Sequence, residues 1–301
     1  MNNSQFDDVT INRRDLSSSD EIKEVKLAIP HMRVVSRSKK ENINRIIDLI
    51  KEAKREQDIH IFLLPSGFVW GPLTERLMVS QNILKKVAER IPGSLTNTLI
   101  DIARKYSVYI LTGALLEKAG PRHYISSVLI SPFREEGVVY KYRKLNLTDS
   151  EYAYVSPGKD LGLIDFSDLR VGLLLEEDIY APEIARVLVI AGIDLMISFS
   201  KLSRSFSNIK YIALARAIEN NTSLINIGGI LESSEEEIVN IKTLIIKGNG
   251  DIISESKDSS EEEIFYVSFR IKDPKRRTRK RLSNEVFKRV ISYARRNKLL
   301  L

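Results

Sequence analysis

A run of acidic residues follows directly after a short apolar segment in the middle of the chain. The apolar segment is residues 171–175, and the acidic residues are Glu176, Glu177 and Asp178. Pro182 lies where a helix would begin, because proline is favoured in the first helical turn. A buried strand that turns sharply into a helix is where α/β enzymes hold a nucleophile clear of the sheet. The sequence therefore predicts that Glu176 lies at the tip of such a turn.

The spacing of residues around Glu176 matches a known nucleophile segment. Gly172, Glu176, Asp178, Pro182 and Glu183 follow one another as Gly-x-x-x-Glu-x-Asp-x-x-x-Pro-Glu. This pattern resembles the Gly-x-x-x-Cys-x-Asp-x-x-x-Pro-Glu segment of the nitrilase, or carbon-nitrogen hydrolase, superfamily. The resemblance extends from about residue 26 to about residue 277. It implies an α/β fold, a four-layer α-β-β-α sandwich that pairs into dimers, and an active site with a glutamate base, a lysine and a cysteine nucleophile.

The resemblance also locates the other positions of that active site. The family's base follows a strand as apolar-apolar-Pro-Glu, and here Ser66 follows the same apolar-apolar-proline sequence. The family's lysine, in a Tyr-Arg-Lys-x-x-Leu segment, is retained as Lys144. Glu151 matches an accessory acid that often follows the lysine. Residues 215–220, Ala-Arg-Ala-Ile-Glu-Asn, match a segment that serves the structure around the site.

Two of the three catalytic positions carry the wrong chemistry for amide hydrolysis. The chain has no cysteine, and a carboxylate at position 176 is a far poorer nucleophile than a thiolate. A serine at position 66 cannot accept a proton as a carboxylate does at neutral pH. Glu177 would not rescue the site, since neighbouring side chains on a strand point to opposite faces. We therefore expect a degenerate, catalytically inactive site formed by Ser66, Lys144 and Glu176, with Glu151 as an accessory residue.

Several arrangements of this site stay open from the sequence. The first is a buried Lys144–Glu176 ion pair that fills the old site, because an unpaired buried lysine is costly. The second is a re-tooled enzyme, with Glu176 as base or nucleophile, Lys144 as electrostatic support, and Ser66 as hydroxyl donor or as the partner of Lys144 in a dyad. The third is a pocket that binds a small molecule non-covalently. A divalent-metal site is not expected, because three consecutive carboxylates cannot all converge from a strand end.

Composition excludes several other kinds of site. Zero cysteines exclude disulfides, thiolate metal sites and thiol catalysis. Three scattered histidines disfavour a histidine metal site or a catalytic triad, and no cofactor is expected. No apolar run approaches the roughly 20 residues that span a bilayer, and the N-terminus lacks a hydrophobic signal core. We therefore expect a soluble, cytoplasmic protein.

Alternating strand and helix patterns are expected to position these residues. Besides the central segment, apolar runs or alternation predict strands at residues 24–30, 59–65, 107–114, 124–131, 137–142, 194–199, 223–227, 241–246, 252–253 and 264–269. Helical periodicity predicts helices at residues 41–56, 79–88, 99–106, 182–191 and 209–221. Helices and strands alternate in two halves with antiparallel elements mixed in, which is typical of a layered α/β sandwich.

Positive charge is concentrated at the C-terminal end. Residues 275–298 hold eleven Lys or Arg against one acid, so this stretch carries +10, whereas the whole chain carries +7. Apolar residues recur near helical spacing from residue 282 to residue 294. A cationic amphipathic helix of this kind fits nucleic-acid phosphates. The candidate contact residues are Lys275, Arg276, Arg277, Arg279, Lys280, Arg281, Lys288, Arg289, Arg295 and Arg296.

Other interpretations of this basic tail stay open. The tail braces a homodimer, since related proteins pack a C-terminal segment across the partner subunit, or it docks on a different protein. Acidic runs at residues 235–237 and 261–263 are also able to fold onto it and neutralise it.

The sequence thus divides into a flexible N-terminal arm (residues 1–22), a nitrilase-like domain (23–273) and the basic amphipathic tail (274–301). We expect a homodimeric, catalytically inactive nitrilase-like protein that acts in binding, scaffolding or regulation. DNA or RNA binding through the tail is the favoured specific function. The alternatives are an enzyme with altered chemistry at Lys144 and Glu176, and a subunit that interacts only with proteins.

Overall fold

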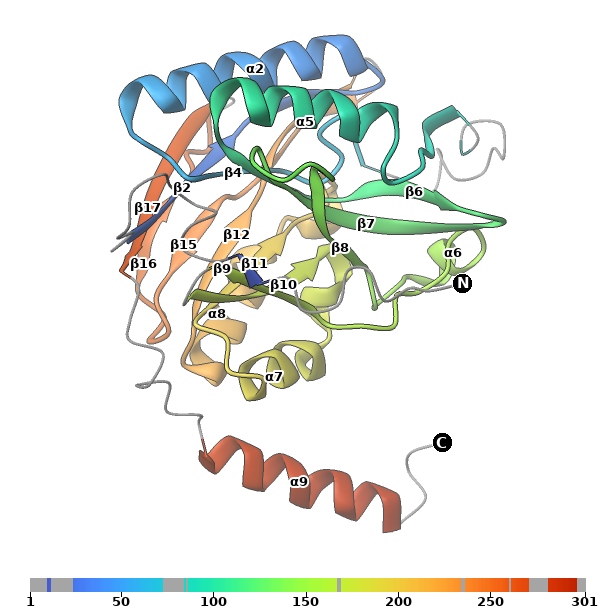
Figure 1. Ribbon diagram of the computed structural model, residues 1–301. Coiled ribbons are helices and arrows are strands. Elements are labelled where there is room, and N and C mark those ends of the chain that lie inside the picture. The colour runs from blue at the N-terminus through green and yellow to red at the C-terminus, as the bar shows by residue number, and fades with distance from the viewer. Residues whose placement is uncertain are drawn as a thin grey trace.

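Two β-sheets stack face to face and carry helices on both outer faces (Figure 1). The computed structural model describes residues 10–11, 24–72, 84, 86–166, 169–233, 236–259, 261–270 and 281–296. The order of layers is helix, sheet, sheet, helix, which confirms the predicted α-β-β-α sandwich.

The first sheet carries mainly strands from the first half of the chain. Its order is β17 (Glu263–Arg270), β2 (Glu24–His31), β4 (Ile61–Leu64), β5 (Tyr109–Thr112), β7 (Arg122–Ile130) and β6 (Leu115–Ala119), with β8 (Val138–Arg143) also paired to β7. Helices α2 (Lys39–Glu56) and α5 (Ser94–Tyr106) cover its outer face (Figure 1). The buried side of α2 presents Ile46, Leu49, Ile50 and Ala53, the spacing of an amphipathic helix.

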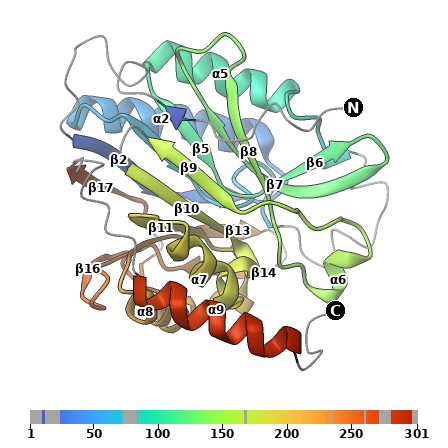
Figure 2. The same ribbon diagram turned by 60° about the horizontal axis from the view of Figure 1, so that its bottom comes forward.

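The second sheet carries strands from the second half. Its order is β1 (Thr10–Ile11), β9 (Gly162–Phe166), β10 (Leu169–Leu175), β11 (Leu195–Phe199), β12 (Ser223–Ile227), β15 (Leu244–Ile246) and β16 (Ile252–Glu255). Helices α7 (Pro182–Ile190) and α8 (Ile209–Asn220) cover its outer face, as both ribbon views show (Figures 1 and 2). Strands β10, β11 and β12 are parallel, so their carboxyl ends meet at one edge of the sheet.

The glycine of the central motif sets the spacing between this sheet and its helices. A Cβ added at Gly172 would lie 2.9 Å from Ile193 Cδ1 and 3.2 Å from Leu188 Cδ1. A larger residue would therefore push the α7 layer away from β10, because close-packed interiors leave no room for an extra carbon.

Short elements complete the described chain. A third sheet contains β14 (Glu236–Ile241), β13 (Gly229–Ser233) and β3 (Arg33–Val35). Short helices are α6 (Asp149–Tyr152), η2 (Glu176–Tyr180) and η3 (Arg204–Phe206). The C-terminal helix α9 (Arg281–Arg296) lies on the α7–α8 side of the body (Figures 1 and 2).

Alternation along the strands creates two cores. Side chains such as Leu63, Leu173 and Ile197 pack between the two sheets. Their neighbours, such as Leu174 and Met196, pack against the helical layers. Strands buried on both faces read as continuous apolar runs, which explains why residues 171–175 are apolar throughout.

Most predicted elements are present within a few residues of their expected bounds. Strands β1, β3, β6, β9, β13 and β14 were not predicted from the sequence. Most of the helix predicted at residues 79–88 lies outside the described residues. Within the predicted N-terminal arm, Thr10 and Ile11 pair in parallel with β9, and the domain boundaries stay predictions. Among the described helices, none has the length and apolar character needed to cross a bilayer.

Candidate functional site

Glu176 occupies the sharp turn that the sequence predicts. Strand β10 ends at Leu175, and Glu176 opens the 3-10 helix η2, which leads through Ala181 into α7. Its backbone has a φ of +52°, in the left-handed region that side chains other than glycine rarely adopt. The Glu176 residue is only 2% exposed. A strained residue at a strand end, with its side chain buried, is a common feature of functional sites.

Lys144 brings three carboxylates together. It follows β8 directly and is 1% exposed. Its Nζ donates to the two carboxylate oxygens of Glu151 at 2.9 and 2.7 Å, to Glu176 Oε2 at 3.2 Å, and to Glu177 Oε2. The predicted Lys144–Glu176 ion pair is therefore present. Lys144 is shared among three acids rather than paired with one.

Glu151 is fixed in place by a helix cap. Thr148 caps the short helix α6, and the Thr148 backbone N–H donates to Glu151 Oε2 at 3.0 Å in a capping box. This local structure holds the carboxylate of Glu151 towards Lys144.

A second lysine, Lys201, enters the site and was not identified from the sequence. Its Nζ donates to Glu151 Oε1 at 2.8 Å and to Glu177 Oε1 at 2.7 Å, and lies 3.8 Å from Glu176 Oε2. Lys201 comes two residues after β11, which is the parallel neighbour of β10. The only sequence signal for Lys201 was its position just after a strand. The residues that follow two neighbouring parallel strands lie at the same edge of the sheet, so Lys201 lies near Glu176.

The predicted orientation of Glu177 was wrong. We expected its side chain on the face opposite to Glu176, but both carboxylates contact Lys144. The strand ends at Leu175, and the alternation of side chains ends with it, because residues of the 3-10 turn follow a helical period instead. Two of the three consecutive carboxylates, those of Glu176 and Glu177, therefore converge on Lys144.

Asp178 turns away from the lysines and ties the turn to its surroundings. Its carboxylate accepts hydrogen bonds from the Tyr142 hydroxyl at 2.7 Å and from the backbone N–H groups of Leu145, Asn146 and Leu175 at 3.0, 2.7 and 3.0 Å. These four donors explain how a buried acid is tolerated here.

The segment at residues 215–220 supports the same turn from outside, as predicted. Arg216 Nε donates to the Ile179 carbonyl at 2.8 Å, and Arg216 Nη2 donates to the Tyr180 carbonyl at 3.4 Å. Arg216 Nη1 also donates to Glu219 Oε1 at 3.0 Å. Helix α8 thereby holds the end of η2.

The charges of this cluster do not balance. Three carboxylates (Glu151, Glu176 and Glu177) face two ammonium groups (Lys144 and Lys201). Fully ionised, these five side chains, which we name the charge cluster, carry one surplus negative charge. Glu176 has the longest contacts with the lysines, so the surplus charge is least compensated there.

The pKa directions agree with this imbalance. Burial raises the pKa of Glu176 above its ordinary value of 4.5, and the two lysines offset this only in part. Burial acts the same way on Glu151, but Lys144 and Lys201 outweigh it and hold the pKa of Glu151 below 4.5. For both lysines, burial lowers the pKa, but the carboxylates, Glu176 first, outweigh it and hold the pKa above its ordinary value of 10.5.

Ser66 lies beside the site without joining the charge cluster. It is fully buried after β4, donates from Oγ to the Phe199 carbonyl at 3.5 Å, and accepts from the Ala114 N–H at 3.3 Å. Within the part of the chain that the structure describes, no hydrogen bond joins Ser66 to Lys144. The Ser66–Lys144 dyad is therefore not formed in this arrangement.

The three acids of the charge cluster are close enough to hold a cation. One carboxylate oxygen from each of Glu151, Glu176 and Glu177 lies within 4.8 Å of the others. The ammonium groups of Lys144 and Lys201 already contact these oxygens, so the lysines supply the positive charge that a metal would bring.

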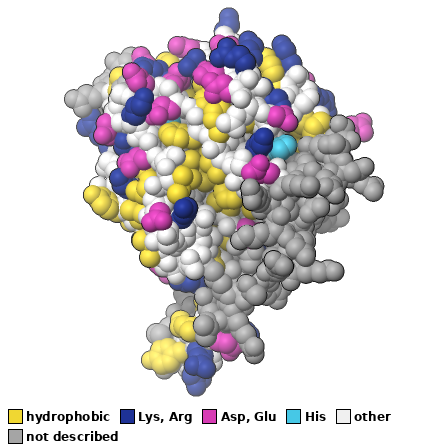
Figure 3. Space-filling model, turned by 90° about the vertical axis from the view of Figure 1, so that its left-hand side faces the viewer, with side chains coloured by type: hydrophobic (Ala, Val, Ile, Leu, Met, Phe, Trp, Pro, Cys, Tyr) yellow, Lys and Arg dark blue, Asp and Glu magenta, His cyan; other side chains and the backbone are white. Residues whose placement is uncertain are grey.

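The tail is described only in its second half. Lys275, Arg276, Arg277, Arg279 and Lys280 lie outside the described residues. Arg281, Lys288, Arg289, Arg295 and Arg296 belong to α9. At the bottom of Figure 3, hydrophobic and basic side chains occupy different parts of this helix's surface.

One of the acidic runs is engaged with the body of the protein. The Glu262 carboxylate accepts hydrogen bonds from the Arg33 N–H at 2.8 Å and from Arg45 Nη2, and Glu263 accepts from the Lys257 N–H at 2.8 Å. These bonds hold the two acids near β3, α2 and β17, and no hydrogen bond joins them to the described side chains of α9.

Comparisons with known proteins identify the family. The carbon-nitrogen hydrolase family profile matches residues 26–274. A nitrilase of Pyrococcus abyssi is 30% identical over 241 residues, which are 79% of this chain and 87% of the relative. An (R)-stereoselective amidase of Pseudomonas sp is 32% identical over 182 residues, 60% of this chain and 61% of the relative. The omega-amidase NIT2 of Bos taurus is 25% identical over 249 residues, 79% of this chain and 86% of the relative.

Solved structures show the same fold. Nit3 of Saccharomyces cerevisiae, a member of branch 10 of the nitrilase superfamily, superposes with a TM-score of 0.67 at 22% identity, covering 86% of this chain and 93% of that chain. An amidase of Nesterenkonia sp. superposes with a TM-score of 0.67 at 18% identity, covering 86% of this chain and 95% of that chain. With the family match spanning residues 26–274, this chain belongs to the carbon-nitrogen hydrolase, or nitrilase, superfamily.

Proposed function

We propose that this protein is a non-catalytic member of its superfamily that acts by binding, as a scaffold or a regulator. The observation that carries the proposal is the charge cluster itself. A carboxylate occupies the tip of the turn at Glu176, and both lysines of the site are already bonded to carboxylates.

The chemistry of the cluster is unsuited to acyl transfer. A carboxylate is a far poorer nucleophile than a thiolate towards amides and nitriles. The Ser66 hydroxyl cannot act as the general base, and its hydrogen bonds go to backbone groups. Lys144 is bonded to three carboxylates, which compete with any developing oxyanion for its protons. The hydrolytic activities named for the relatives are therefore not expected here.

Hydrolysis assays with restored residues test this proposal. The wild-type chain should release no ammonia from amides or nitriles and no alcohol from esters. Glu176→Cys alone should stay inactive because the general base is missing, whereas Glu176→Cys combined with Ser66→Glu should gain amidase activity. Glu183→Cys, which places a thiol on the exposed part of α7, is the matched control.

The competing function is an enzyme with altered chemistry at Lys144 and Glu176. It requires that the wild type turns over a substrate and that Glu176→Ala abolishes this turnover, which would overturn our proposal. Efficient hydrolysis by Glu176→Cys alone would instead show that the reaction does not need a carboxylate base at position 66. Homodimer formation, a protein partner and a cytoplasmic location stay predictions.

Nucleic-acid binding by the tail is a second proposed function. On α9, the basic residues Lys288, Arg289, Arg295 and Arg296 are exposed, and Glu285 is the only acid of the helix. Glu262 and Glu263 are bonded to the body and form no ion pair with the described side chains of α9. Such a surface suits phosphate contacts, because Phe287 and Tyr293 are its only aromatic residues for base stacking.

Salt dependence tests this second function. Binding of labelled duplex DNA and RNA should weaken steeply with salt, with a log-log slope of about −0.9 per phosphate contact on duplex DNA. Replacing the four exposed α9 cations by glutamine should weaken binding and flatten the slope. A control variant changes four exposed cations elsewhere, Lys40, Lys51, Arg55 and Lys86. No binding at low salt, or binding only to anionic vesicles, would overturn the proposal.

A further inference from the structure

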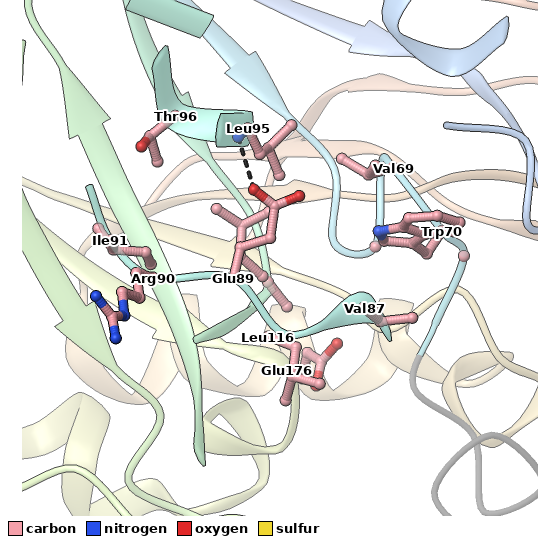
Figure 4. Close-up of a pocket in the computed structure, with 14 residues that line it drawn as sticks. Val69, Trp70, Val87, Glu89, Arg90, Ile91, Leu95, Thr96, Leu116 and Glu176 are labelled. Atoms are coloured by element: carbon pink, nitrogen blue, oxygen red, sulfur yellow. Dashed lines mark hydrogen bonds between the residues drawn. The ribbon is translucent and has the colours of Figure 1, made fainter. Parts of the chain in front are cut away.

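A small cavity adjoins the charge cluster at Glu176. The space open to the centres of water-sized groups is about 30 Å³, which admits a molecule of only a few non-hydrogen atoms. Most of its lining is apolar, and Figure 4 shows Val69, Val87, Ile91, Leu95 and Leu116 around it. Such a lining favours the methylene groups of a small ligand.

Two polar groups at this cavity have an atom without a hydrogen-bond partner among the described residues. The indole Nε1 of Trp70 is buried and has no hydrogen-bond partner among the described residues. Glu176 bonds to the lysines through Oε2, and its Oε1 makes no hydrogen bond to any described residue. Both side chains line the cavity (Figure 4). A buried N–H group is almost always hydrogen-bonded, and a carboxylate oxygen that faces a cavity is able to accept a further hydrogen bond. These two atoms therefore suit a ligand that has both a donor and an acceptor.

The other carboxylate in the lining is already neutralised. Glu89 accepts from Lys39 Nζ at 2.6 Å and from the Leu95 N–H at 2.7 Å, the bond drawn in Figure 4. Glu176 is therefore the acid at this cavity whose charge is only partly compensated, and the charge cluster carries one surplus negative charge.

We propose that the cavity binds a small primary ammonium compound, with its charged nitrogen at the Glu176 carboxylate and a hydrogen-bond acceptor facing the Trp70 N–H. The ligand would be the third cation of the charge cluster, and it would balance the three carboxylates. An ammonium group suits the place better than a metal ion, because the carboxylates are already arranged around the N–H donors of two lysines. This inference rests on the proposed non-catalytic function of the same site.

Fluorescence of Trp70 provides a direct readout, because it is the only tryptophan in the chain. Titration of the full chain with ethanolammonium chloride should give a saturable change in emission. Propylammonium, which lacks the acceptor oxygen, should bind more weakly. Ethylene glycol, which lacks the charge, and magnesium chloride at matched ionic strength should give no saturable change.

Matched variants locate the binding. Glu176→Gln should weaken ethanolammonium binding at least tenfold, and Glu183→Gln, which changes an exposed acid of α7, should leave it unchanged. Equal binding by Glu176→Gln, equal binding of ethylene glycol, or no saturable response would overturn the inference. If Glu176→Gln does not fold, the inference is tested by comparing the binding of ethanolammonium, propylammonium and ethylene glycol to the wild type.

The outcome separates this inference from the proposed function. Ammonia release measures turnover, and fluorescence measures binding. A chain that binds ethanolammonium and also hydrolyses amides would contradict only the proposed function. An inactive chain without saturable binding would contradict only the inference.

Discussion

Strand β8 and the residue after it supply cations to two buried ion networks that differ in charge balance. Lys141 Nζ donates to Glu117 at 2.7 Å, and Arg143 donates to the same carboxylate at 2.8 and 2.7 Å. Ser126 adds a hydroxyl donor at 2.6 Å. Lys144, the next residue, belongs to the charge cluster. Among the described residues, the first network joins two cations to one carboxylate, and the charge cluster joins three carboxylates to two cations.

This difference shows which property distinguishes the candidate site. Glu117 and Glu176 are equally buried, at 1% and 2% exposure. Burial raises the pKa of Glu117, but Arg143, Lys141 and Ser126 outweigh it, and that pKa lies below 4.5. The pKa of Glu176 lies above 4.5. Burial of a carboxylate therefore does not indicate a functional site by itself. Incomplete compensation of the charge of a buried carboxylate does indicate a candidate site.

The largest expected effect is on the lysine that the three carboxylates share. Lys144→Met would leave two buried carboxylates and the half-buried Glu177 with one ammonium group, and should lower the free energy of unfolding by about 3–5 kcal/mol. Lys141→Met is the matched control, because Glu117 keeps Arg143 and its loss should be smaller. Urea unfolding measures both. Equal losses would contradict the distinction between the networks.

An intermediate effect is expected in the cation-rich network. Glu117→Gln removes the charge that Lys141 and Arg143 share. These side chains are 15% and 20% exposed, so water can partly replace the lost partner. The free energy of unfolding should fall by about 1–3 kcal/mol, which denaturant titration would measure. A loss as large as that of Lys144→Met would show that exposure does not relieve these cations.

The smallest effect is expected near pH 4.5 for Glu176→Gln, which removes the surplus charge. Near the ordinary pKa of 4.5, its free energy of unfolding should stay within about 1 kcal/mol of the wild type. Because folding raises the pKa of Glu176, the native state binds this proton more tightly than the unfolded state does. The wild type therefore loses stability as pH rises from 4.5 through the raised folded value.

The glutamine variant lacks this loss, so its stability relative to the wild type should rise across the same pH window. Glu151 contributes in the opposite direction, since its lowered pKa gives stability that is lost as pH falls below 4.5. Glu151 is present in both proteins, and its contribution largely cancels in the difference. Urea unfolding at a series of pH values measures the difference. A constant or falling difference would contradict the direction assigned to Glu176.

The sequence was sufficient to predict the layers of the fold and three members of the charge cluster. Spacing around the central motif predicted Glu176, and resemblance to known segments predicted Lys144 and Glu151. Lys201 was missed because its role depends on the parallel pairing of β10 with β11, where Leu175 lies opposite Phe199.

Glu177 was missed for a different reason. Its orientation depends on the residue at which the strand ends, and boundaries are the least certain part of a sequence-based assignment. Strand β9 was missed because five residues that begin with glycine and include an aspartate give a weak strand signal.

The pairing of Thr10 and Ile11 with β9 has a consequence for self-association. These residues form β1 at one end of the second sheet and pair with Asp165 and Phe166. An unpaired edge strand offers free N–H and C=O groups to the strands of other molecules, and nature commonly covers such edges. Thr10 and Ile11 thus cover the end of β9 at Asp165 and Phe166, and a chain that begins after residue 23 is expected to aggregate more readily than the full chain.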